Sequence, residues 1–93
     1  MIENSHDTIF IGKKPLMSYV TSAIIQLSSL PSITLKARGM SIGLAVDVTQ
    51  ILLKKTNVFE VGRVKISSES LESQDGRKRD VSTIEIPIKK VAA

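Results

Sequence analysis

The sequence predicts an α/β fold, specifically an α+β two-layer sandwich with the element order β-α-β-α-β-β. Two segments carry apolar residues at helical spacing, others alternate apolar with polar residues, and Gly or Pro lies at several boundaries. Two strand–helix units favour parallel pairing through right-handed crossovers, and the last two strands favour an antiparallel hairpin. We therefore expect a four-stranded mixed sheet with two helices on one face.

The first predicted strand–helix unit lies near the start of the chain. Residues 8–12 (TIFIG) are rich in β-branched and aromatic side chains and end at a glycine, which indicates a strand. A helix is expected to begin at Pro15 and to stop before Pro31. Its apolar stripe consists of Leu16, Val20, Ala23, Ile24 and Leu27.

The second unit follows directly. Residues 32–38 (SITLKAR) alternate apolar with polar side chains, which predicts a strand, and Gly39 ends it. A helix over residues 42–55 follows Ser41, whose side chain suits an N-cap. Its main apolar face consists of Leu44, Ala45, Val48, Ile51 and Leu52, with Val46 and Leu53 outside that face. A helix that is apolar on more than one side is either deeply buried or packed on a partner chain.

The last third of the chain predicts a long hairpin. Residues 58–68 form one predicted strand whose apolar positions change parity around Gly62, so we expect a β-bulge there. Asp75-Gly76 is a common hairpin turn. Residues 81–91 form the last strand, in which Pro87 lacks an N–H and should leave its side of the ladder unpaired. One face of this strand should carry Ile84, Ile86 and Ile88.

Length and composition limit the class of protein. The chain has 93 residues, 42% of them hydrophobic, so we expect a single domain over residues 1–93 with a disordered tail at 1–7. The absence of cysteine excludes disulfides and thiolate metal sites. No apolar run approaches the roughly 18 residues of a membrane span, and the start of the chain lacks a signal-peptide pattern. A cytoplasmic protein that does not enter a membrane is expected.

Residues for catalysis are scarce. The single histidine, His6, falls in the expected tail, and no His, Cys or Asp/Glu cluster has the spacing of metal ligands. Residues 39–43 (GMSIG) open a helix but lack the Lys-Ser/Thr ending of a nucleotide-binding loop. They are therefore interpreted as a strand-to-helix turn rather than a nucleotide site. We expect no enzyme, no metal and no cofactor.

The charge balance favours an anionic partner, with nucleic acid first among the candidates. Thirteen Lys and Arg stand against nine Asp and Glu, which gives a net charge of +4 and a pI near 9.6. Lys13 and Lys14 follow the first strand, and Lys36 and Arg38 end the second. In a parallel pair both sites fall at the carboxyl end of the sheet, where ligands commonly bind. The alternative is that these side chains are simply solvated.

Three consecutive cations, Arg77, Lys78 and Arg79, follow the hairpin turn, and three acidic residues lie around them. An arm with arginine at its tip suits the minor groove of DNA, where the potential is most negative. Equally, a charged hairpin can prevent edge-to-edge pairing of sheets. We expect no exposed aromatic side chain in the basic regions, so base stacking should contribute little.

Several segments have a familiar order and spacing: IGKKP (residues 11–15), KARG (36–39), AVD (45–47), and SQDGR with VSTIEI (73–77 and 81–86). Together they resemble the Alba family of archaeal chromatin proteins, and the resemblance covers nearly the whole chain. It implies a β-α-β-α-β-β fold and a homodimer, or a heterodimer with another Alba-family chain. It also implies binding to double-stranded DNA, or to RNA, with little sequence preference.

The resemblance also assigns roles to the basic residues. Lys13 and Lys14 would form the central contact with nucleic acid, and Lys36 and Arg38 would extend it. Arg77, Lys78 and Arg79 would be the tips of arms that reach the minor groove. Lys13 or Lys14 would be an acetylation site, because acetylation removes a charge at a phosphate contact. Such a protein is expected on the chromosome in the cytoplasm, where it would condense DNA.

The chain departs from the family pattern at two places, which indicates a divergent paralogue. Met40 follows KARG, where the best-known members carry a second basic residue. Residues 54–61 lack the family's Phe near the end of the second helix, a residue that supports contacts between dimers. Two alternatives to a DNA-binding dimer are an RNA-binding subunit of an RNA-processing assembly and a heterodimer partner that modulates a more typical Alba protein.

Overall fold

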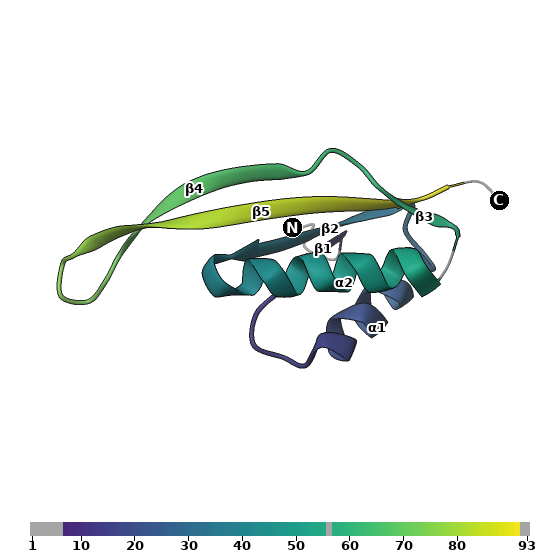
Figure 1. The fold of residues 1–93 in the computed structure, drawn as a ribbon, viewed down its shortest axis with the longest axis horizontal. Helices are drawn as coiled ribbons and strands as arrows, with labels where there is room; N and C mark the ends of the chain where they lie inside the picture. The colour runs from purple at the N-terminus through teal and green to yellow at the C-terminus, as the bar shows by residue number, and fades with distance from the viewer. Residues whose placement is uncertain (1–6, 56, 92–93) are drawn as a thin grey trace.

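The computed structural model describes residues 7–55 and 57–91, which contain two α-helices and five strands (Figure 1). The elements are β1 (Thr8–Phe10), α1 (Leu16–Leu27), β2 (Ser32–Arg38), the short 3₁₀ helix η2 (Gly39–Ser41), α2 (Ile42–Lys55), β3 (Phe59–Val61), β4 (Lys65–Glu72) and β5 (Lys78–Lys90). Apart from Asp7, the expected tail, with His6, lies outside the described residues. Within the described ranges, neither helix is long and apolar enough to cross a membrane.

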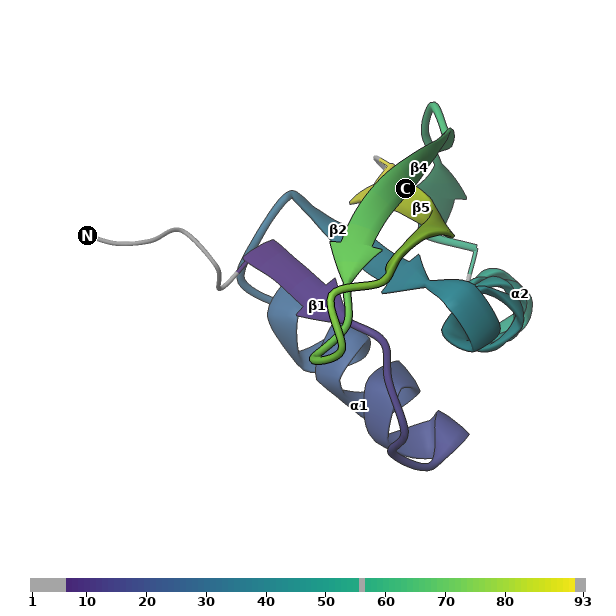
Figure 2. The ribbon, with the colours of Figure 1, turned by 90° about the vertical axis from the view of Figure 1, so that its left-hand side faces the viewer.

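The strands form one mixed sheet, and both helices cover the same face of it (Figure 2). The strand order is β1-β2-β5-β3, and β4 also pairs with β5. β1 and β2 are parallel, as their connection through α1 predicts, whereas β5 runs antiparallel to β2, β3 and β4. The predicted class, two helices on one face of a mixed sheet, is therefore confirmed.

The sheet has five strands rather than the expected four, because the predicted strand over residues 58–68 is interrupted. β3 ends at Val61 opposite Ile88, and β4 begins at Lys65 opposite Glu85. Three residues between β3 and β4 thus face two residues of β5. One extra residue is the count of a β-bulge, and it reverses the side-chain parity as the sequence predicted.

Pro87 explains why the pairing of β5 with β3 and β4 is interrupted between Ile88 and Glu85. Its carbonyl accepts the N–H of Gly62 at 2.9 Å. The N–H and C=O of a strand residue point to the same side, so the N–H that Pro87 lacks would also have faced β3 and β4. A Cβ on Gly62 would stand 3.2 Å from Cγ of Pro87, so glycine lets the two segments approach without a shift.

The core lies between the sheet and the helices and is mostly aliphatic. In register across β2 and β5, it contains Ile33 with Ile88, Leu35 with Ile86, and Ala37 with Ile84. From the helices, it contains Val20, Ala23, Leu27, Ala45, Val48 and Leu52. Burying a large aliphatic side chain stabilises a fold by about 1.5–3 kcal/mol, so these residues dominate its stability. Ile24, expected in the stripe of α1, is instead 40% exposed, and Tyr19 is buried.

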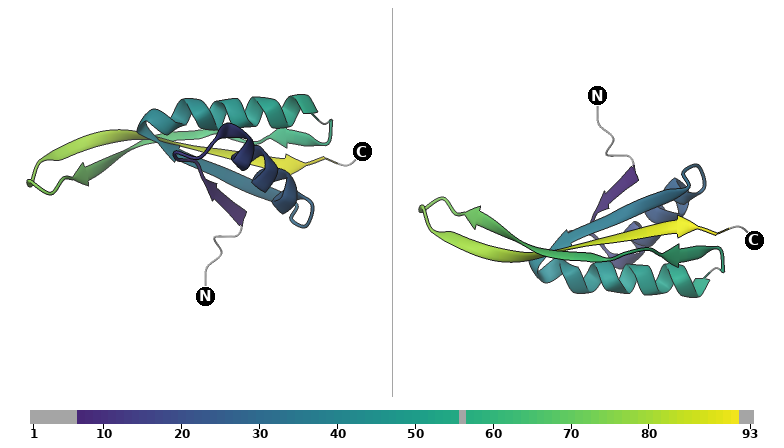
Figure 3. Two further views of the ribbon diagram at one scale, coloured as in Figure 1. Left: turned by 90° about the horizontal axis from the view of Figure 1, so that it is seen from below. Right: turned by 90° about the horizontal axis from the view of Figure 1, so that it is seen from above.

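β4 and the first half of β5 extend past the helices as a two-stranded arm (Figures 1 and 3). The hairpin extends further toward its tip than predicted, since β4 continues to Glu72 rather than residue 68 and β5 begins at Lys78 rather than residue 81. At the tip, the N–H of Gly76 donates to the carbonyl of Ser73 at 3.0 Å. Gly76 has φ +84°, a conformation that favours glycine. The predicted Asp75-Gly76 turn is confirmed.

Candidate nucleic-acid interface

The loop between β1 and α1 carries Lys13 and Lys14 and is held by one buried hydroxyl group. Oη of Tyr19 accepts hydrogen bonds from the backbone N–H of Gly12 at 2.8 Å and of Lys14 at 2.9 Å. Tyr19 lies on the buried face of α1, so the loop is tied to the core through the helix that follows it. The lysine side chains are exposed while the backbone beneath them is held in place.

Sequence reasoning missed the role of Tyr19. It lies three residues after Leu16 and four before Ala23, so helical spacing includes it in the buried face, but the predicted stripe omitted it. The available signal was its position one turn after Pro15, where a tyrosine has an apolar ring for the core and a hydroxyl within reach of the preceding loop.

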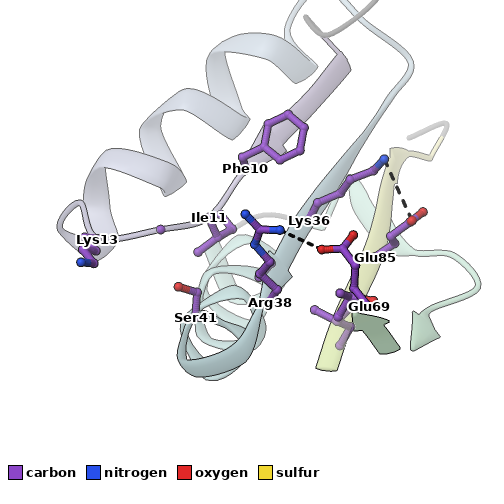
Figure 4. A pocket seen from close by; sticks show the side chains of 12 residues that line it. Phe10, Ile11, Lys13, Lys36, Arg38, Ser41, Glu69 and Glu85 are labelled. Atoms are coloured by element: carbon purple, nitrogen blue, oxygen red, sulfur yellow. Dashed lines mark hydrogen bonds and ion pairs between the residues drawn. The ribbon is translucent and has the colours of Figure 1, made fainter. Parts of the chain in front are cut away.

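Lys13, Lys36 and Arg38 line one open hollow at the carboxyl end of β1 and β2 (Figure 4). Its volume is about 610 Å³. The parallel pairing of β1 with β2 creates this arrangement, because it brings the loop after β1 beside the end of β2. Lys36 and Arg38 alternate with the buried residues of β2 and so lie on the sheet face away from the helices. Lys14 is exposed but is not among the lining residues.

Two carboxylates pair with the cations of this hollow, and the sequence did not predict either pair. Oε1 of Glu69 accepts a hydrogen bond from Nη1 of Arg38 at 2.8 Å, and Nζ of Lys36 lies 4.0 Å from Oε2 of Glu85 (Figure 4). The Arg38 pair spans the central strand β5, from β2 to β4. It therefore ties the base of the arm to the body. All four side chains are at least 41% exposed, so these pairs are weak.

Phe10 lines the same hollow, and its side chain is 67% exposed. It is the parallel neighbour of Lys36 and stands beside it in Figure 4. The expectation that the basic regions expose no aromatic side chain is therefore wrong. β1 alternates, so burying Ile9 turns Phe10 to the other face, which neither α1 nor α2 covers.

The three cations of the hairpin line a second hollow, of about 430 Å³, at the tip of the arm. It shares no lining residue with the first hollow. Arg77 belongs to the turn, and its Nε lies 3.5 Å from Oδ2 of Asp75. Lys78 and Arg79 are the first two residues of β5, so their side chains point to opposite faces of the arm. The structure thus separates the predicted basic residues into a body group and a tip group.

Asp75 organises the turn that carries the tip group. The hydroxyl of Ser73 donates a hydrogen bond to its carboxylate, and the N–H of Arg77 donates another at 3.2 Å. These bonds, with that from Ser73 first, hold the pKa of Asp75 below its usual value. The carboxylate is therefore charged at neutral pH and can accept both bonds.

The chemistry of both hollows suits an anionic ligand with hydrogen-bonding groups. Cations supply charge and donors for phosphate, and the paired carboxylates supply acceptors. Within residues 7–55 and 57–91, no three His, Cys, Asp or Glu side chains gather as metal ligands would.

Comparisons with known proteins agree on one family. The model of the family described as Alba matches residues 7–68. A curated protein from Nitrosopumilus maritimus, named DNA/RNA-binding protein Alba, is 62% identical over 92 residues, which cover 97% of this chain and 97% of the relative. A protein of the same name from Methanocella arvoryzae is 41% identical over 90 residues, with coverage of 94% and 93%.

Solved structures show the same fold. Alba from Thermoplasma volcanium matches with a TM-score of 0.82 at 36% identity, covering 88% of this chain and 98% of that one. ALBA1 from Trypanosoma brucei matches with a TM-score of 0.76, covering 96% of this chain and 73% of that one. At 20% identity this second likeness shows the fold alone.

Proposed function

Because this chain belongs to the Alba family, we propose that it is a dimeric chromatin protein that binds double-stranded DNA, and also RNA, with little sequence specificity. The observation that supports this most directly is the gathering of Lys13, Lys36 and Arg38 around one hollow. The names of two relatives, both DNA/RNA-binding proteins, point the same way. The proposal includes no enzymatic step and no cofactor.

Phosphate neutralisation supplies most of the binding free energy in this proposal. Each cation that meets a phosphate releases counterions from the nucleic acid, which makes binding strongly dependent on salt. Phosphate contacts carry no sequence information, which accounts for the low specificity. Tyr19 fixes the loop backbone before binding, so less conformational entropy is lost when Lys13 and Lys14 engage.

The pairs with Glu69 and Glu85 are exchanged for phosphate in this mechanism. An exposed ion pair contributes roughly 0–1 kcal/mol, so replacing its carboxylate by a phosphate costs little. Arg38 and Lys36 are thereby held near the face of the sheet and remain available to a ligand. The arm carries Arg77, Lys78 and Arg79 away from the body, toward the minor groove.

The test is binding to a random duplex of about 40 base pairs across a salt series. With about three to four phosphate contacts per subunit, a plot of log K against log salt should have a slope of roughly −5 to −7 per dimer. Lys13→Ala/Lys14→Ala removes up to four contacts per dimer, so the slope should flatten by about 3 to 4. The matched control is Lys54→Ala/Lys55→Ala, which removes the same charge at the end of α2.

Each unexpected result has a clear meaning. If the double mutant at Lys13 and Lys14 binds with the wild-type slope, the main phosphate contacts are made by the arms instead of by this loop. Equal flattening in the Lys54 and Lys55 control would mean that net charge alone drives binding. A wild-type chain that binds no duplex at low salt would overturn the proposal of a DNA-binding homodimer and would leave a heterodimer partner or an RNA-binding subunit as its role.

The proposal also places the protein on the chromosome in the cytoplasm, where it would condense DNA, and makes Lys13 or Lys14 an acetylation site. Both side chains are exposed, as a modifying enzyme requires. Acetylation would remove a charge at the central contact and weaken binding. Peptide mass spectrometry of the native protein that finds both lysines unmodified would contradict this part.

A further inference from the structure

Phe10 is a feature of the hollow that phosphate binding does not use. Phe10 is 67% exposed, although burial of a phenylalanine side chain stabilises a fold. Register places it in a row across three strands, with Lys36 on β2 next to it and Glu85 on β5 beyond. The row therefore presents an aromatic ring, a cation and a carboxylate on one face of the sheet.

We propose that Phe10 is a stacking platform for one unpaired base, and that the hollow around it binds a nucleotide of single-stranded nucleic acid. This inference rests on the proposed function and names a second class of ligand for the same surface. Aromatic rings accept any base, because every base has a π-face.

The lining of the hollow fits a nucleotide part by part. The ring would stack on the base, and Lys13, Lys36 and Arg38 would contact the phosphates on either side. Glu69 and Glu85 would accept hydrogen bonds from N–H groups on the base edge or from a ribose hydroxyl. The volume of about 610 Å³ lies within the range of roughly 300–1,000 Å³ that small-ligand sites occupy.

A duplex cannot use this platform. In a duplex the faces of the bases are stacked on one another, so a protein meets phosphates and groove edges. Unpaired bases of RNA loops or single strands have free faces. The same surface can therefore bind duplexes through its cations alone, and single strands through its cations together with Phe10.

The first experiment uses Phe10→Trp, because the chain has no tryptophan and the substitution introduces a single tryptophan at the platform, which can be excited selectively at about 295 nm. Its fluorescence is titrated with a 12-nucleotide adenine RNA, the matching DNA strand, a DNA duplex and an abasic strand of equal length. Stacking on either single strand should quench the emission strongly, while the duplex and the abasic strand should leave it nearly unchanged. Comparing RNA with DNA shows whether the 2′-hydroxyl contributes.

The second experiment measures affinity. Phe10→Ala should bind the adenine RNA at least about fivefold more weakly, as the loss of one stacked base predicts, and should bind duplex DNA as tightly as the wild type. The control is Ile25→Ala, which removes a similarly exposed apolar side chain from α1. Both variants should keep the wild-type sedimentation coefficient.

Two results would overturn the inference. One is equal binding of the adenine RNA by the wild type and Phe10→Ala, with quenching of Phe10→Trp by the abasic strand as well. The other is a change of oligomeric state in Phe10→Ala, which would make Phe10 a contact between protein chains. After either result, duplex binding with a steep salt slope would still support the proposed function. Failure of the stacking inference can therefore be told apart from failure of the proposed function.

Discussion

At the scale of the residue, the hydroxyl group of Tyr19 links the core to the candidate interface. Its ring packs among the buried residues of α1, and its oxygen accepts the N–H groups of Gly12 and Lys14. The loop backbone is consequently tied to the core at two points without burying its lysines. Sequence reasoning found the lysines from their charge and position, but it missed this support, because it left Tyr19 out of the buried face of α1.

Removing this hydroxyl should therefore affect stability and binding together. Tyr19→Phe keeps the ring but leaves two partly buried N–H groups without their acceptor, so the free energy of unfolding should fall by about 1–2 kcal/mol. Duplex affinity should fall as well, because the loop becomes mobile. Urea unfolding and the salt series measure the two effects. Thr49→Val is the control, since it removes a buried hydroxyl that bonds within α2, and it should leave affinity unchanged.

At the scale of the element, the sequence predicted the helices, the turn and the parity change of the hairpin, because each depends on local spacing or on a Gly or Pro. It also predicted that Lys13, Lys14, Lys36 and Arg38 would converge, since parallel pairing brings their segments together. The structure gathers Lys13, Lys36 and Arg38 around the hollow, but Lys14 does not line it. It did not predict the pair between Arg38 and Glu69. That pair depends on the register of β4, which the extra residue after Val61 shifts by one position.

The close approach of Gly62 to Pro87 gives a test of this element. Gly62→Ala would place Cβ 3.2 Å from Cγ of Pro87, so the free energy of unfolding should fall by about 1–3 kcal/mol. Gly43→Ala is a matched substitution on α2 with nothing within 4 Å of the new Cβ, and it should raise stability by about 0.5–1 kcal/mol. Urea unfolding of both variants measures the difference. If both substitutions change the free energy of unfolding in the same direction, the packing explanation is contradicted.

At the scale of the whole molecule, one long side exposes apolar residues that a second chain could cover. Ile66 is 80% exposed, Val64 44% and Val46 40%. Ile66 lies on β4, Val64 lies just before β4, and Val46 lies on α2. The strand β4 and the helix α2 run along the same side of the molecule (Figure 3). β4 pairs with β5 and has no second neighbouring strand within residues 7–55 and 57–91. In the proposed dimer, this is the side that the second chain, a second copy or another Alba-family chain, would cover.

A charge placed on this side should dissociate the dimer. Ile66→Asp should sediment as a monomer in the micromolar range, because burying an unpaired carboxylate in an apolar interface is costly. Ile25→Asp is the control, since Ile25 is 62% exposed on α1 and should tolerate the charge. A dimer that survives Ile66→Asp, or a monomeric wild type, would contradict the inference. The heterodimer is tested by native mass spectrometry after this chain is mixed with a second Alba chain. Finding only homodimers would exclude it.

β5 is continuous from the middle of the core to the tip of the arm. Its 13 residues cover about 43 Å at roughly 3.3 Å per residue. Ile84, Ile86 and Ile88 are buried in the core and anchor one half of the strand. The other half, which begins with Lys78 and Arg79, projects from the body as part of the arm. One continuous strand therefore links the body group of cations, through its pairing with β2, to the tip group of cations. Arg38 is paired with Thr83 of β5, five residues from Lys78, so about 17 Å of strand separates the two groups of cations, close to half a turn of B-DNA.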